Sequence, residues 1–125
     1  MTVDPAVPED VRDHLPLTPV VFEILLALSD GERHGYALMQ TVEERTGGAV
    51  RLHAGTLYRA LARLVEAGCI DEVDAPVAVE DADERRRYYA LTSLGRRVGA
   101  AEARRLESQV GAARAQGLLE GLERA

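Results

Sequence analysis

The segment VRLHAGTLYRALARLVEAGCIDEV, residues 50–73, decides the fold of this 125-residue chain. Within it, Leu57 is followed at spacings of 4, 7 and 8 by the apolar residues Leu61, Leu64 and Val65. These spacings place the four side chains on one face of an α-helix. The segment therefore predicts a helix that buries this face against a core.

The opposite face of the same helix carries Thr56, Arg59 and Arg63, at spacings of 3 and 7. Guanidinium groups bind phosphate in a bidentate manner and also pair with the O6 and N7 edge of guanine. This face is therefore suited to an anionic partner and to a helix that reads the major groove. Arginines opposite an apolar stripe are equally common on a helix face that is merely solvated, and the helix alone does not separate the two interpretations.

The residues after this helix predict a hairpin. Gly68 ends the helix, and Ile70–Val73 has the composition of a short strand. A second strand, Arg87–Leu91, follows a loop that cannot be helical throughout because it contains Pro76. A helix followed directly by a two-stranded hairpin is the order of a winged helix-turn-helix, so we predict a mainly α fold with a small β-wing.

Three segments together resemble the signature of PadR-type transcriptional regulators, which are bacterial winged-helix proteins. They are HGYALMQTVEERTGG (34–48), GTLYRALARLVEAGCI (55–70) and RRRYYALTSLGRR (85–97), and the resemblance extends from about residue 17 to about residue 119. It implies a homodimeric regulator that binds double-stranded DNA at an inverted-repeat operator, is expected to be a repressor, and is released by a small-molecule effector. The alternative is a winged-helix module that contacts proteins without specific DNA binding.

The resemblance also implies which residues face DNA. Gly55 would allow a close approach of the backbone, and Tyr58 is expected to pack at the core edge with its hydroxyl towards a phosphate. Tyr36 either donates to a phosphate or packs at a helix start with its hydroxyl in water, and for His34 a capping role is favoured over a ligand role. The predicted DNA-binding set is Tyr36, Arg51, His53, Gly55, Thr56, Tyr58, Arg59, Arg63, Arg85, Arg86 and Arg87.

The distribution of charge is more informative than its sum. The formal net charge is −6, yet residues 85–97 carry five arginines and no acidic side chain, whereas residues 71–84 are strongly acidic. The acidic loop of the predicted wing, residues 74–84, should be repelled by DNA. The arginines at 85–87 are expected beside the minor groove, with neutralisation of this loop as the alternative.

The N-terminal third predicts an arm and two helices. Residues 1–16 contain three prolines and are expected to form an arm with at most one helical turn, around residues 9–14. Thr18 caps a first helix from about residue 19 to 29, which is apolar nearly all round and therefore suggests a partner subunit. A second helix spans about residues 35–46, and Val50–Leu52 is expected to join the wing sheet as a third strand.

The C-terminal part predicts one long helix, from Ser93 to about Leu122, that begins after the capping residue Thr92. Its glycines each weaken it by roughly 1 kcal/mol relative to alanine, so it needs a partner to be stable. The resemblance places the homodimer contact on this helix and the first helix, and the predicted contact residues are Val21, Leu25, Leu94, Val98, Leu106, Val110 and Ala113. The predicted organisation is an arm (1–16), a winged-helix domain (17–92) and a C-terminal dimerisation helix (93–125).

Several functions are disfavoured by the composition. Cys69 is the only cysteine, which excludes an internal disulfide and a cysteine metal cage; we expect a small packed thiol, with a redox sensor as the alternative. No stretch approaches the roughly 18 apolar residues of a membrane span, and no signal peptide is recognisable, so a cytoplasmic protein is expected. No phosphate-binding loop, metal-ligand spacing or nucleophile–base pair indicates an enzyme, and no cofactor is expected.

Overall fold

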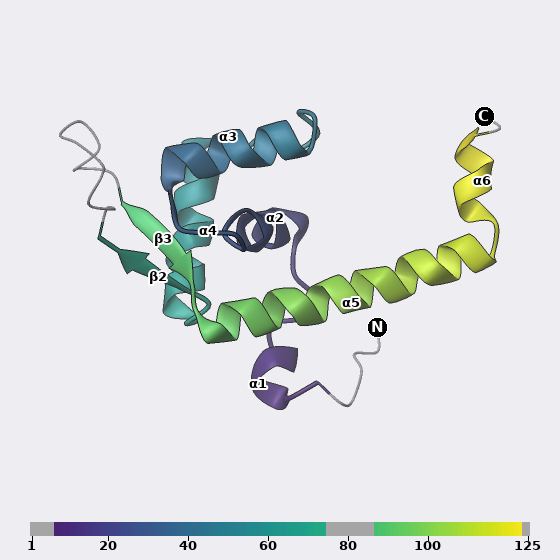
Figure 1. Ribbon diagram of the computed structural model, residues 1–125, viewed down its shortest axis with the longest axis horizontal. Coiled ribbons are helices and arrows are strands. Elements are labelled where there is room, and N and C mark those ends of the chain that lie inside the picture. The colour runs from purple at the N-terminus through teal and green to yellow at the C-terminus, as the bar shows by residue number, and fades with distance from the viewer. Residues whose placement is uncertain (1–6, 75–86, 124–125) are drawn as a thin grey trace.

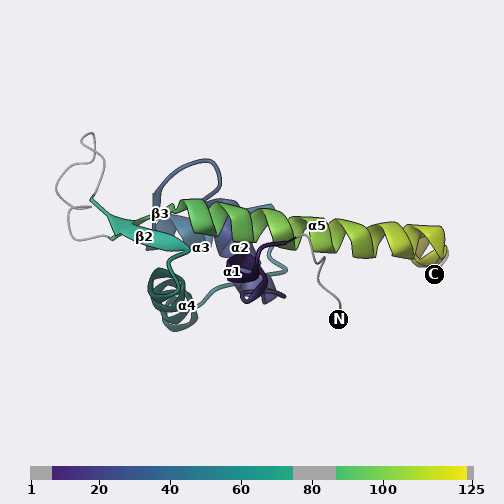
Figure 2. The same cartoon turned by 90° about the horizontal axis from the view of Figure 1, so that it is seen from below.

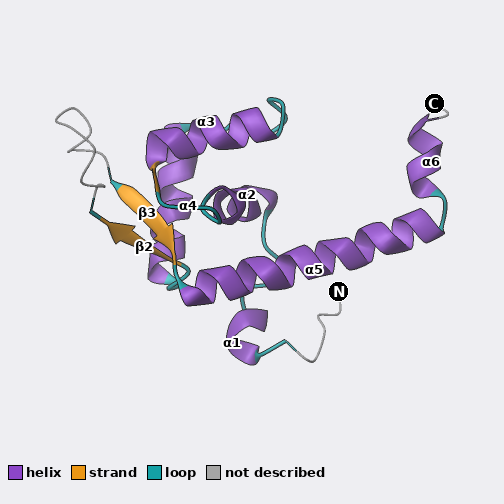
Figure 3. Ribbon diagram, viewed as in Figure 1, coloured by secondary structure: helices purple, strands orange, loops and turns teal. Residues whose placement is uncertain are grey.

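The computed structural model describes residues 7–74 and 87–123 of the chain. The elements are α1 (Glu9–Arg12), α2 (Pro19–Ala27), β1 (Arg33–His34), α3 (Gly35–Arg45), α4 (Ala54–Glu66), β2 (Ile70–Val73), β3 (Tyr88–Leu91), α5 (Ser93–Ala115) and α6 (Leu118–Glu123). Helices α2, α3 and α4 and the sheet form a body at one end of α5, and α5 extends away from this body towards α6 (Figure 1). The predicted mainly α fold with a small sheet is confirmed (Figure 3).

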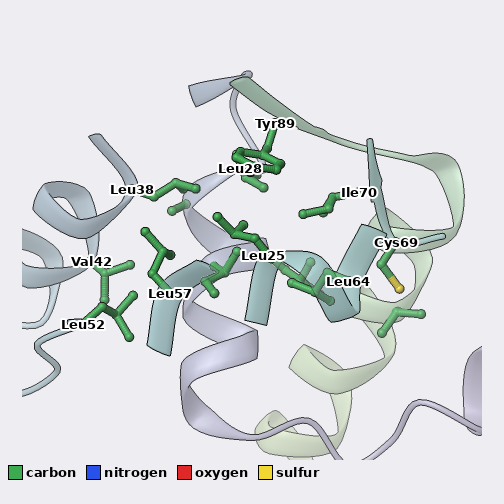
Figure 4. Packing of buried hydrophobic residues seen from close by; sticks show 14 of the residues in the cluster. Leu25, Leu28, Leu38, Val42, Leu52, Leu57, Leu64, Cys69, Ile70 and Tyr89 are labelled. Carbon is green, nitrogen blue, oxygen red and sulfur yellow. The ribbon is translucent and has the colours of Figure 1, made fainter. Parts of the chain in front are cut away.

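The core lies between the three helices of the body and the sheet. Leu28 directly after α2, Leu38 from α3 and Leu57 from α4 are each exposed by 1% or less and lie close to one another (Figure 4). Burial of a side chain of this size stabilises the fold by roughly 1.5–3 kcal/mol. Val65 was predicted to complete the apolar stripe of α4 and is instead 37% exposed, because it lies at the edge of that stripe, about 80° from Leu57.

Three predicted helix caps are confirmed. The hydroxyl of Thr18 accepts a hydrogen bond from the backbone N–H of Val21 at 3.2 Å, and that of Thr92 accepts from Gly95 at 3.0 Å. Nδ1 of His34 accepts from the N–H of Ala37 at 3.0 Å, so the capping role of this imidazole is also confirmed.

The ends of α2 and α4 are fixed by specific hydrogen bonds. Gly68 has a φ of 79° and the next N–H donates to the carbonyl of Leu64 at 2.9 Å, which closes α4 as predicted. Helix α2 ends at Ala27, two residues before the predicted end. Its last carbonyl accepts from Nε of Arg33 at 2.8 Å, and Arg96 of α5 donates to the carbonyl of Ser29 at 3.2 Å.

The sheet has the strand order β1-β3-β2, and both pairs are antiparallel. Its third strand is Arg33–His34, directly before α3, and the prediction of a strand at Val50–Leu52 was wrong. That segment is held instead by the end of α3, since the N–H of Val50 donates to the hydroxyl of Thr46 at 3.1 Å. The hairpin strands were predicted correctly, except that β3 begins at Tyr88, one residue later than expected.

The C-terminal helix is broken, whereas a single helix was predicted. Gly117 adopts a φ of 75°, a left-handed conformation that glycine tolerates, and α6 begins at the next residue. The N-terminal segment contains the predicted single turn, α1. Its Val11 is 2% exposed and its Asp10 lies 3.3 Å from Arg97, so α1 packs against the first half of α5 (Figure 2).

The residues predicted for a dimer contact fall into two groups. Leu25 and Val98 are 2% and 0% exposed, so both belong to the core of the single chain. A helical pattern does not distinguish the body of the same chain from a second subunit, so a part for these two residues in a dimer contact stays a prediction. Val110 is 45% exposed, and the others are partly buried, namely Val21, Leu94, Leu106 and Ala113. Within the described ranges, no helix is both long and apolar enough to cross a bilayer.

Candidate nucleic-acid interface

The outward face of α4 presents an exposed hydroxyl and two exposed guanidinium groups. Thr56, Arg59 and Arg63 are all exposed, while Leu57 and Leu61 on the opposite face are 0% and 1% exposed. Helix α4 packs against α3 and β2 through this leucine face, which fixes the orientation of the arginines. In the part of the chain that the structure describes, neither arginine forms an ion pair or a hydrogen bond, so both guanidinium groups remain available to an anionic partner.

The start of α4 is open to an external ligand. His53, Ala54 and Gly55 are all exposed, and His53 occupies the N-cap position without a side-chain hydrogen bond to the helix. A β-carbon added at Gly55 would meet only Nη1 of Arg59, at an ordinary contact distance of 3.7 Å. Internal packing therefore does not require glycine here. The predicted close approach of a ligand to this backbone stays a prediction.

Tyr58 joins α4 to the start of α3. A β-carbon built at Gly35 would lie 2.5 Å from the hydroxyl oxygen of Tyr58 and 2.9 Å from its Cζ, so the tyrosine ring occupies the space that a side chain would need. Gly35 is buried, whereas Tyr58 is 45% exposed. The predicted packing of this ring is thus confirmed. Its contact with Gly35 was not predicted. Nothing in the spacing of the two residues indicated their contact.

Gly35→Ala is expected to lower the free energy of unfolding by about 1–3 kcal/mol, because the new methyl group overlaps the ring of Tyr58. In a Tyr58→Ala background the same change should cost less than about 0.5 kcal/mol, since no ring then fills the space. Urea unfolding of the wild type, the two single variants and the double variant gives the coupling. Additive costs would show that the two residues do not interact.

Aromatic rings connect α3 to the wing. The ring of His34 meets that of Tyr88 edge-on, with centroids 5.3 Å apart, and lies nearly parallel to that of Tyr36 at 6.4 Å. Tyr36 is 51% exposed, so one side of its ring packs and the rest reaches solvent. Tyr89 is 3% exposed, and its burial together with the nearby carboxylate of Glu72 raises the pKa of its hydroxyl, which therefore stays protonated at neutral pH.

Two of the predicted arginines are engaged by acidic side chains. Nε of Arg87 lies 3.1 Å from a carboxylate oxygen of Glu72 on β2, and Nε of Arg51 lies 3.6 Å from that of Glu43 on α3. Both arginines are exposed, so each ion pair stabilises the fold by less than about 1 kcal/mol. A phosphate group could therefore replace the carboxylate as the partner of either arginine. The predictions for Arg85, Arg86 and the acidic wing loop fall outside the described residues.

Cys69 and possible metal ligands bear on chemistry other than nucleic-acid binding. Cys69 is 1% exposed, and burial raises the pKa of its thiol, which confirms a packed side chain at the corner between α4 and β2. Across residues 7–74 and 87–123, no group of three or more histidine, cysteine or acidic side chains could hold a metal ion.

The structure brings the predicted residues of α3 and α4 to one end of the molecule. Figures 1 and 2 both place the start of α3, helix α4 and the hairpin at the end opposite α6. Tyr36, Tyr58 and the outward arginines of α4 thus lie on neighbouring elements. A basic helix face flanked by a wing is an arrangement that reads nucleic acid in winged-helix proteins.

Known proteins resemble this chain in sequence and in fold. The family model described as the Transcriptional regulator PadR-like family matches residues 24–101. A 37.1 kDa protein encoded in transposon TN4556 of Streptomyces fradiae is 39% identical over 82 residues, which cover 64% of this chain and 21% of that protein. A transcriptional regulator from Clostridium thermocellum is 25% identical with a TM-score of 0.63, over 85% of this chain and 93% of that one. Bacillus subtilis PadR in complex with operator DNA has the same fold, with 23% identity, a TM-score of 0.55 and coverage of 65% and 44%.

The extent of these matches decides what they establish. The chain spans about a fifth of the length of the Streptomyces relative, so that comparison relates a part of the larger protein to this one. The family match, in contrast, covers more than half of the 125 residues and includes all the predicted residues on α3, α4 and the wing. The chain therefore belongs to the PadR-like family of transcriptional regulators.

Proposed function

We propose that this protein is a homodimeric, sequence-specific DNA-binding regulator that represses transcription from an inverted-repeat operator. One observation carries this proposal: Arg59 and Arg63 are exposed on the face of α4 that points away from the core, and no described residue pairs with them. Guanidinium forks one helical turn apart can contact guanine edges or phosphates in the major groove. Bacillus subtilis PadR, which has the same fold, forms a complex with operator DNA, and this supports DNA as the ligand.

Symmetry determines the form of the operator. Two copies related by a two-fold axis would present two α4 helices to successive major grooves, roughly 34 Å apart. The operator should then be an inverted repeat with half-sites about one helical turn apart. Release by a small-molecule effector belongs to the same proposal. The net charge of −6 favours one alternative, a winged-helix module that contacts proteins, and that module would bind no promoter DNA.

Arg63→Ala is expected to weaken binding to the operator by about 1–3 kcal/mol, which is roughly 5- to 150-fold in affinity. The protein is titrated with the DNA upstream of its own gene and with a scrambled duplex of equal length. If Arg63 reads a base, the loss is confined to the operator; if it binds a phosphate, both duplexes lose affinity and the salt slope falls by about 0.9. Arg104→Ala, the same change at an exposed position of α5, is the matched control. Wild-type affinity of Arg63→Ala for both duplexes would contradict the proposal.

A further inference from the structure

The arginines in and around α4 divide into two classes by their partners. Arg59 and Arg63 on the helix itself are exposed and form no ion pair with any residue in the described ranges. Arg51, which precedes the helix, and Arg87, which precedes β3 on the wing, each lie beside a carboxylate. The helix thus presents unpaired cations, whereas the two arginines that flank it in the predicted site already have an anionic partner.

The ion pair on the wing follows from the register of the hairpin. Glu72 of β2 lies opposite Tyr89 of β3, and Arg87 is two residues before Tyr89. Because alternate residues of an extended chain point to the same side, these three side chains share one face of the hairpin. Nε of Arg87 lies 3.1 Å from a carboxylate oxygen of Glu72, and the guanidinium also donates to the hydroxyl of Tyr89. The carboxylate and the hydroxyl together hold the guanidinium on the hairpin.

The second ion pair joins α3 to the segment that leads into α4. Nε of Arg51 lies 3.6 Å from a carboxylate oxygen of Glu43, a residue of the last turn of α3. This separation is too long for a hydrogen bond, so the attraction is electrostatic only. The pair before α4 is therefore weaker than the pair on the wing.

Both ion pairs are open to a competing anion. The side chains of the two arginines and the two glutamates are between 45% and 74% exposed. Ion pairs with this exposure are weak, because water screens both charges and the long side chains lose conformational freedom when they pair. Neither carboxylate is therefore needed to hold the fold together, and a second anion can replace either one at little cost.

A backbone phosphate is an anion that fits these arginines. Carboxylate and phosphate oxygens both accept charge-assisted hydrogen bonds from a guanidinium, so a phosphate can take the position of either carboxylate. Phosphate contacts fix a protein on the duplex without dependence on sequence, whereas base contacts provide specificity. The loss of either carboxylate should therefore strengthen binding to every duplex by the same factor.

We propose that Glu72 and Glu43 are internal competitors of DNA. Each carboxylate holds an arginine in the free protein, and a phosphate of the duplex displaces it in the complex. The two glutamates thus lower the affinity for DNA of any sequence, while the unpaired arginines of α4 read the operator. This inference rests on the proposed function and identifies two residues that limit its affinity.

Glu72→Gln tests the competition on the wing. The change keeps the shape of the side chain and removes its charge, so the affinity for the DNA upstream of the gene and for a scrambled duplex should rise about 2- to 5-fold for each copy bound. Asp71→Asn is the matched control, since Asp71 is exposed on the other face of β2 and has no ion pair within residues 7–74 and 87–123. It removes the same charge without the release of an arginine, and its effect on both affinities should be smaller.

A double variant separates competition from a general effect of charge. In an Arg87→Ala background there is no guanidinium to release, so Glu72→Gln should then change the two affinities no more than Asp71→Asn does. A gain that persists in this background, or equal gains from Glu72→Gln and Asp71→Asn, would overturn the inference. Weaker binding by Glu72→Gln would also overturn it and would show that the carboxylate positions Arg87 for DNA.

Glu43→Gln tests the competition before α4. Its matched control is Glu44→Gln, the same change at the exposed neighbouring position of α3. The gain in affinity from Glu43→Gln should exceed that from Glu44→Gln and be smaller than that from Glu72→Gln, because the pair before α4 is the longer one. Equal effects of Glu43→Gln and Glu44→Gln would refute the role of Glu43.

The wild-type titrations distinguish this inference from the proposed function. If the wild type bound both duplexes equally, sequence-specific regulation would be contradicted, while the variants would still test the competition on either duplex. If the wild type preferred the upstream DNA and Glu72→Gln bound no more tightly, the proposed function would stand and the inference would fail. If neither the wild type nor any variant bound either duplex, both would fail.

Discussion

Gly95→Ala is expected to lower the free energy of unfolding by about 3 kcal/mol, at the upper end of the range for overpacked cores. A β-carbon at this position would overlap the backbone carbonyl oxygen of Cys69 and lie 3.1 Å from Cδ2 of Leu91. A backbone carbonyl cannot rotate away as the end of a flexible side chain can. The same carbonyl accepts the N–H of Thr92 at 3.1 Å, so any displacement would also disturb the start of α5.

Gly111→Ala is the matched control for this prediction. Gly111 lies in the same helix, and a β-carbon there would meet nothing within 4 Å. Because alanine favours helix over glycine, this variant should be more stable than the wild type by about 0.5–1 kcal/mol. Both variants are compared by urea unfolding at one protein concentration, since association of a protein would make its apparent stability depend on concentration. If the two variants changed the free energy of unfolding by a similar amount, the overlap with the carbonyl of Cys69 would not be destabilising.

Helix α4 could be predicted closely because one periodic pattern determines it. The leucines of α4 recur on one face, so the angular position of Arg59 and Arg63 follows from helix geometry alone. Gly68 and Thr92 likewise act through local backbone geometry, and both act as predicted. Features of this kind depend only on residues that are close together in the sequence, so they can be predicted without knowledge of the tertiary structure.

The third strand could not be predicted because its partner is distant. Arg33–His34 is two residues long, which gives no alternation, and it pairs with Tyr88 and Tyr89, more than fifty residues away. The β-prone residues Val50–Leu52 have a stronger local strand pattern. However, the N–H of Val50 donates to the hydroxyl of Thr46 and not to a neighbouring strand. Strand pairing of this kind is decided by tertiary structure and not by propensity.

The candidate site shows the same division between local and distant information. The exposed residues of α4 could be placed from sequence, whereas the contact of Tyr58 with Gly35 depends on how α3 meets α4. The break in the last helix is a related case. Gly99, Gly111 and Gly117 look equivalent in sequence, yet only Gly117 among them adopts a positive φ, at the point where α5 has left the support of the body.

Arg105→Met is expected to lower the free energy of unfolding by about 3–5 kcal/mol, because it leaves a buried carboxylate without its cation. Glu102 is 1% exposed, and its two carboxylate oxygens accept from Nε and Nη2 of Arg105 at 2.8 and 2.7 Å. The backbone N–H of Leu17 is a further donor to the same carboxylate, so the pair joins the segment before α2 to α5. Arg104→Met, the same change at the exposed neighbouring position, should alter stability by less than about 0.5 kcal/mol.

The pH dependence of this loss follows from the direction in which the pKa of Glu102 moves. The hydrogen bonds from Arg105 hold the pKa of this carboxyl below its usual value, so the pair contributes stability above the unfolded-state pKa and loses it as the pH falls through the folded-state pKa. Without the guanidinium, burial should instead raise the pKa, and protonation should then relieve the buried charge. The difference in urea midpoint between the wild type and Arg105→Met should therefore shrink between neutral pH and about pH 4, near the ordinary glutamate pKa. A difference that stays constant over this range would show that the carboxylate of Glu102 is not the source of the loss.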